Sequence, residues 1–165
     1  MKKRVFLLFL FFLSLHYSYS QELPKLQHVK LNKKAHFKDT EPLILKVIIY
    51  LFETPIDKRN KSRSEAGQFL ISWMNGTPNY TFYLDERETN YFNTEADLML
   101  MYMAGLTKFT LENPTIKDQK TLVLGSLQLL LPYLNNQENK KSWSADLWQL
   151  NEAYQKQKLE KFLYP

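Results

Sequence analysis

The sequence predicts an all-α fold, a bundle of about five helices, and three observations lead to this prediction. Apolar residues recur at helical spacing in several long segments, sequences typical of helix caps precede them, and strands do not alternate with helices as in a parallel sheet. Residues 76–93 interrupt the pattern and are predicted to be irregular and partly extended. With 165 residues, of which 44% are hydrophobic and 24% charged, the chain has the composition of one globular domain.

Residues 1–20 have the layout of a secretory signal peptide. Basic residues at 2–4 precede an apolar run at 5–13, and small residues occupy the first and last positions of 18–20. We expect cleavage before residue 21 and a periplasmic or secreted mature chain. No later apolar run reaches the roughly 20 residues of a membrane span, so no transmembrane segment is expected after cleavage.

The charge and the cysteine count exclude several classes of function. Loss of three basic residues with the signal peptide lowers the formal charge from +5 to about +2, which gives no reason to expect nucleic-acid binding. The chain has no cysteine. It therefore has no lipobox cysteine for a lipid anchor, no disulfide, and no thiolate nucleophile or metal ligand.

The mature chain begins with a predicted arm, followed by one helical domain at residues 39–165. Residues 21–38 are polar and lysine-rich and show no sustained period, so we expect an extended arm. The first helix should begin at Asp39 or Thr40 as N-cap, with Pro42 tolerated in its first turn. Its long apolar run favours a buried helix, although the β-branched residues leave a strand as an alternative.

The second helix follows a basic loop at residues 54–63. Ser62 and Glu65 have the spacing of a capping box, and the helix should end near Gly76. Its apolar residues recur at i, i+3, i+4, i+7 and i+8, which makes it the clearest amphipathic helix of the chain. They are Ala66, Phe69, Leu70, Trp73 and Met74.

The irregular segment leads to a third helix that should be central. Residues 79–84 alternate as a short strand or extended rim would, and residues 85–93 are acidic and typical of a turn. A second capping box at 94–97 predicts a helix from there to about residue 112. Its first half is apolar all round, and Gly105 is small enough to admit a neighbouring helix.

Two more helices complete the predicted bundle. The fourth should start at Pro114 and end or kink at Pro132, because proline removes an amide donor. The fifth should start at Ser144 as N-cap, with a hydrophobic staple between Trp143 and Trp148. Its buried side should include Leu147, Leu150, Tyr154 and Phe162.

No set of residues predicts catalysis or a cofactor. The sequence lacks a nucleophilic serine motif, a phosphate-binding loop and a dinucleotide fingerprint. His28 and His36 show no metal-ligand spacing, so we expect no metal site, no cofactor and no catalytic residue. A small periplasmic hydrolase using a pair of carboxylates remains the alternative, since the separation of carboxyl groups cannot be deduced from the sequence.

Binding is therefore the leading hypothesis, and aromatic residues are its main candidates. Tyr83, Tyr91 and Phe92 lie in the irregular segment, and we expect them to line a partly exposed groove against the third helix. Lys58 and Arg59 belong to the densest basic cluster, which is either a solvated loop or a contact for an acidic partner or anionic envelope lipid. The hypothesis is a protein that binds a protein or an envelope component without catalysis.

Three stretches also resemble a group of known proteins. Residues 52–57, 66–78 and 97–111, the last with a Tyr-Met-Ala-Gly core, are similar to small exported helical proteins of Bacteroides- and Flavobacterium-type bacteria. The resemblance covers roughly residues 40–160. It implies a periplasmic or secreted helical domain and transfers no functional residue.

Overall fold

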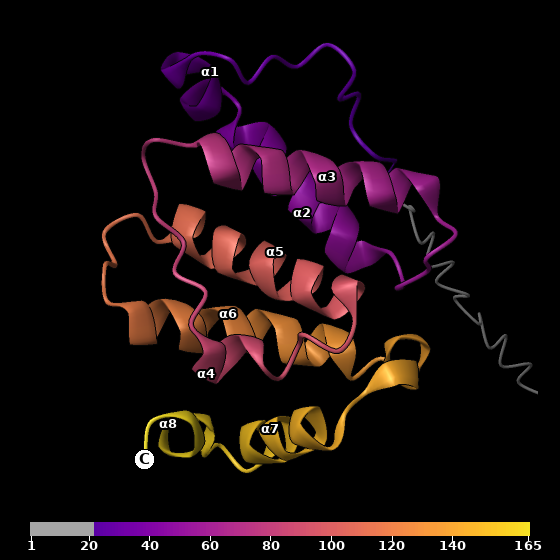
Figure 1. The fold of residues 1–165 in the computed structure, drawn as a ribbon, viewed down its shortest axis with the longest axis vertical. Helices are drawn as coiled ribbons and strands as arrows, with labels where there is room; N and C mark the ends of the chain where they lie inside the picture. The colour runs from indigo at the N-terminus through magenta and orange to yellow at the C-terminus, as the bar shows by residue number, and fades with distance from the viewer. Residues whose placement is uncertain (1–21) are drawn as a thin grey trace, which may run out of the picture.

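The structure is a computed structural model that describes residues 22–165, and its regular elements over this range are all helical (Figure 1). The predicted signal peptide (1–20) lies outside these residues. No strand occurs in the described range, so the all-α fold class is confirmed. The elements are α1 (Lys34–Asp39), α2 (Glu41–Glu53), α3 (Lys61–Gly76), α4 (Glu86–Thr89), α5 (Ala96–Glu112), α6 (Gln119–Leu134), the 3-10 helix η1 (Gln137–Ser142), α7 (Ala145–Gln155) and α8 (Leu159–Leu163).

Helix α5 lies at the centre of the bundle, as its apolar sequence predicts. It packs against α2 and α3 on one side and against α6 on the other (Figure 1). An ideal Cβ at Gly105 would lie 3.1 Å from the main-chain oxygen of Ser126 in α6. This contact is tighter than most Cβ contacts, so glycine favours the close approach of the two helices. No helix in the described residues is long and apolar enough to span a membrane.

The observed helix starts differ from three of the predicted ones. Helix α3 begins two residues earlier than expected. Its N-cap is Asn60, whose side chain accepts a hydrogen bond from the Arg63 amide at 3.1 Å. Helix α5 has Glu95 as N-cap and no side-chain cap. Helix α6 is capped by Asp118, so residues 113–118 form a turn where Pro114 was expected to start the helix. In each region several residues that can cap a helix stand close together, so the local sequence does not distinguish the start.

Two further predictions about α2 and α6 need correction. Thr40 is the N-cap of α2, but its hydroxyl donates to the main-chain oxygen of His36 and does not cap the helix. Pro132 neither ends nor divides α6, which continues to Leu134. Because Pro132 is exposed and lies in the last turn, the missing amide costs a single hydrogen bond and the ring meets solvent.

Residues 21–38 are not simply an extended arm. They include all of α1 except its last residue, and Leu26 and Phe37 are buried in the core. The main-chain oxygen of Phe37 accepts a hydrogen bond from the indole nitrogen of Trp73 in α3 at 2.8 Å. The described part of this segment therefore packs onto the bundle through a few apolar side chains. The lysine-rich composition of the segment gave no indication of this packing.

The predicted start of the last helix is confirmed, but the helix is divided. Ser144 accepts a hydrogen bond from the Leu147 amide, and the rings of Trp143 and Trp148 lie 4.6 Å apart. After α7 the chain turns at Gln157, whose φ of 55° is left-handed, and α8 follows. Such a conformation costs a residue other than glycine about 1–2 kcal/mol. The turn is a Schellman motif, a helix end at which glycine is usual.

Candidate functional site

The structure does not gather the three predicted aromatic residues into one groove. Phe92 is fully buried and stacks on Tyr102 of α5, with ring centroids 4.9 Å apart. The expectation that it is partly exposed is wrong, because the turn after α4 directs its ring onto the central helix. Tyr91 is half-buried and lies 6.1 Å from Phe162 of α8, between ring centroids. Tyr83 alone is freely exposed, at 63%.

The acidic turn at residues 85–93, which includes Phe92, is anchored to the C-terminal end of the chain. Glu88 of α4 is 4% exposed, and its carboxylate accepts a hydrogen bond from the Tyr164 hydroxyl at 2.7 Å. The guanidinium of Arg87 lies over the Tyr164 ring, 5.4 Å from the centroid. Burial, followed by the hydrogen bond to Glu88, raises the pKa of Tyr164 well above its ordinary value. This clamp holds the C-terminal end of the irregular segment on the bundle.

Residues 80–85 form an extended run without a partner strand, which we call the open segment. It leads from the end of α3 past α5 and α6 to α4 (Figure 1). Within the described chain, none of its main-chain amides donates a hydrogen bond. Among the described main-chain oxygens of residues 80–84, that of Tyr83 alone accepts a hydrogen bond. The donor is the side-chain amide of Gln119, at 3.1 Å.

A pocket of about 290 Å³ lies beside the open segment. Its inner wall is fixed by aromatic packing, since Tyr80 and Phe82 lie 6.0 Å and 6.3 Å from Trp73 between ring centroids. Apolar side chains predominate among the residues that line it. They are Ile71, Met74, Asn75, Thr77, Tyr80, Thr81, Phe82, Leu84 and Met103.

The predicted basic candidates are arranged as ion pairs. Lys58 lies 2.6 Å from Glu95, and this hydrogen bond raises the pKa of the lysine. Arg59 is exposed and lies 3.3 Å from Asp57. Both line a cavity of about 350 Å³ together with four carboxylates, which we call the acidic cavity. The carboxylates belong to Asp57, Glu95, Asp97 and Glu138. Lys58 and Arg59 are thus each paired with a carboxylate.

A buried arginine stands behind this cavity. Arg63 is 1% exposed, and its Nη1 donates to the main-chain oxygens of Leu51 and Thr54 at 2.8 Å and 2.9 Å. Its Nε lies 3.9 Å from an Asp97 oxygen. The guanidinium also lies 6.0 Å from the centre of the Tyr133 ring. Arg63 therefore joins the end of α2 to α3, α5 and α6.

The raised pKa of Tyr133 predicts how the stability of the fold changes at alkaline pH. Burial raises its pKa to about 12, against a partial lowering by Arg63. Between pH 10 and pH 12 the unfolded chain loses this proton while the folded chain keeps it, so the free energy of unfolding should fall as pH rises through this window. Tyr133→Phe should flatten the fall in urea unfolding measured at successive pH values. An unchanged pH dependence in that variant would contradict the prediction.

A further hollow lies elsewhere, between α6 and the turn from α7 to α8. This α6–α8 cavity has about 620 Å³ and is lined by Leu124, Gln128, Tyr154, Gln155, Gln157, Leu159 and Glu160. None of these was a predicted site residue. The segments that form it are far apart in the sequence, and the left-handed turn at Gln157 has no glycine or asparagine to reveal it.

No metal centre accompanies these sites in residues 22–165, where no group of three or more His, Asp or Glu side chains is placed to hold an ion. Comparison of the chain with protein-family models, with curated proteins and with solved structures finds no match in any of the three.

Proposed function

We propose that the mature chain is an exported, non-catalytic binding protein that holds an extended polypeptide along the open segment. The observation that carries this proposal is a solvent-facing run of main chain, residues 80–85, whose amides bond nothing in the described protein. An extended chain with free amides and carbonyls is the template to which a peptide adds as a neighbouring strand. The signal-like residues 1–20 support action in the periplasm or outside the cell.

The surroundings of the open segment suit a peptide with apolar side chains. Its two ends are held, by the Trp73 contacts to Tyr80 and Phe82 and by the Glu88 clamp, so little conformational freedom would be lost on binding. The adjacent 290 Å³ pocket offers an apolar side chain of the peptide a place to dock. Tyr83 and Leu84 are exposed, at 63% and 45%, and would be covered by the added strand.

A hydrolase using a carboxylate pair is the second candidate, because four carboxylates line the acidic cavity. Three of them already face a cation: Glu95 faces Lys58, Asp57 faces Arg59, and Asp97 faces Arg63. The arrangement is that of ion pairs. Hydrolysis of chromogenic glycosides by the purified protein, lost in Glu138→Gln, would favour this candidate over binding.

The test of peptide binding compares proline and alanine at the same positions. Successive amides of an extended chain point to opposite edges, so Thr81 and Leu84 sample both. Peptides selected from a phage-displayed random library are titrated calorimetrically against Thr81→Pro, Thr81→Ala, Leu84→Pro and Leu84→Ala. We expect one proline variant to bind at least about tenfold more weakly than its alanine partner, because only proline removes a main-chain donor.

Proline is compatible with extended backbone, so the melting temperature of both proline variants should stay close to that of the alanine variants. Equal affinities of proline and alanine variants at both positions would mean that side chains alone bind the peptide. That result, or a library that yields no binding peptide, would overturn the proposal.

A further inference from the structure

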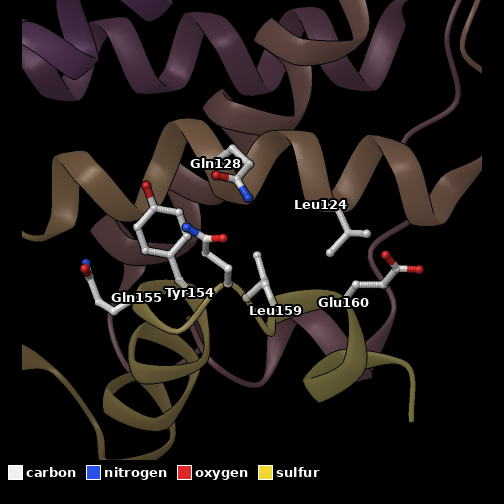
Figure 2. A pocket seen from close by; sticks show the side chains of 7 residues that line it. Leu124, Gln128, Tyr154, Gln155, Leu159 and Glu160 are labelled. Atoms are coloured by element: carbon white, nitrogen blue, oxygen red, sulfur yellow. The ribbon is translucent and has the colours of Figure 1, made fainter.

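The α6–α8 cavity has the size and the chemistry of a ligand site that is separate from the open segment. Its volume of about 620 Å³ falls within the 300–1,000 Å³ typical of small-molecule pockets. In Figure 2, Gln128 and Leu124 point into the hollow from α6, while Tyr154 rises toward it from α7. Leu159 faces them from α8, and Gln155 and Glu160 stand at opposite ends of the view.

The lining has no uncompensated charge. The side chain of Glu160 is paired with Lys120 at 2.7 Å, and the other six lining residues are uncharged. Three of them are glutamines, each of which can donate two hydrogen bonds and accept others. A charged ligand would find no unpaired opposite charge here, whereas a ligand with many hydroxyl groups would find donors and acceptors on several sides.

The apolar part of the lining suits the carbon face of a ring. Tyr154 is half-buried and presents both a flat ring and a hydroxyl, and Leu124 and Leu159 line the same cavity. A saturated ring bearing hydroxyl groups would match both the apolar and the hydrogen-bonding parts of the lining. Its C–H face packs on apolar side chains, and the hydroxyl groups at its edge form hydrogen bonds.

The backbone of Gln157 is a second, independent observation at this site. Its φ of 55° is the sole positive value outside glycine in the described residues, and the residue lines the cavity. Glycine would adopt this turn without strain, yet the chain places an amide side chain there. The Schellman turn accounts for the left-handed φ but not for a residue other than glycine, and strained residues cluster at ligand sites.

We infer that the α6–α8 cavity binds a neutral, hydroxyl-rich ligand with the chemistry of an oligosaccharide, held by Gln128, Gln157 and Tyr154. This inference is independent of peptide binding at the open segment, because the two sites share no lining residue. Each can fail without the other.

The experiment uses maltotriose, cellotriose and chitotriose as probes, with oligogalacturonate as the charged comparison. Binding is followed by saturation-transfer NMR and titration calorimetry on the full mature chain. We expect at least one neutral probe to bind, and Gln128→Ala and Tyr154→Ala each to weaken it about tenfold or more. Gln149→Ala is the matched control, since Gln149 is an exposed glutamine of α7 that does not line this cavity, and it should leave the affinity unchanged.

Gln157→Gly separates the ligand role from a structural one. It relieves the left-handed strain, so the melting temperature should rise by about 2–4 °C. It also removes one amide from the cavity, so oligosaccharide affinity should fall despite the gain in stability. The inference is overturned if no neutral probe binds, if oligogalacturonate binds as tightly, or if the Gln128, Tyr154 and Gln157 variants keep wild-type affinity.

Discussion

Replacement of Arg63 by methionine should lower the free energy of unfolding by about 3–5 kcal/mol. The guanidinium is 1% exposed and donates to the main-chain oxygens of Leu51 and Thr54, so its loss leaves buried acceptors without a donor. Asp97, which lies 3.9 Å from Nε and is itself largely covered, would lose the facing charge. Methionine fills part of the volume, so the loss measures mainly the polar contacts.

Two comparisons make the Arg63 prediction specific. Arg63→Lys keeps a positive charge but cannot reproduce the planar fork, and it should cost about 1–3 kcal/mol. Arg59→Met is the matched control because the Arg59 side chain is 92% exposed, and it should change stability by less than about 0.5 kcal/mol. Urea unfolding followed by circular dichroism measures all three. Equal effects of Arg63→Met and Arg59→Met would show that Arg63 does not hold the helices together.

Trp73→Ala should destabilise the fold by a comparable amount, about 3–5 kcal/mol, because the side chain is fully buried and its removal leaves a large cavity. Trp73→Phe separates packing from hydrogen bonding. It keeps an aromatic ring but leaves the Phe37 main-chain oxygen without its 2.8 Å donor, and it should cost about 1–3 kcal/mol.

Trp148→Phe is the control for this second prediction, since Trp148 is 49% exposed and phenylalanine retains a ring against Trp143. Its expected effect is below about 1 kcal/mol. Thermal and urea unfolding of the three variants give the comparison. Because Trp73 also contacts Tyr80 and Phe82, Trp73→Phe should weaken peptide binding at the open segment less than Trp73→Ala. A cost of Trp73→Phe no larger than that of Trp148→Phe would contradict the role of the indole hydrogen bond.

The candidate sites were predicted less well than the helices, for reasons visible in single residues. Phe92 and Tyr83 lie nine residues apart in a segment without period, and nothing local distinguishes the buried ring from the exposed one. Phe92 is buried because Tyr102 of α5 lies under it, a contact that depends on how α4 sits on the bundle. The α6–α8 cavity combines Gln128 with Gln157, which come together only through the turn into α8.

The start of α3 also shows a feature that the local sequence leaves open. Asn60, Ser62 and Ser64 are all good capping residues, and sequence spacing favoured Ser62. Asn60 is the N-cap in the structure. This start places Arg63 in the first turn, where it reaches the end of α2. The choice among these caps therefore coincides with a contact between α3 and the end of α2 that lies outside the local sequence.

By itself the sequence determined the all-α class, the central position of α5, the small residue at its contact with α6, and the cap and staple at Ser144. Each of these follows from residue size, periodicity or interactions within about four residues along the chain. Only the tertiary structure decided that Phe92 is buried, that residues 80–85 lack a partner strand, and that a cavity lined by three glutamines opens beside Gln157. These features depend on contacts between distant segments, whose free energies the local pattern does not contain.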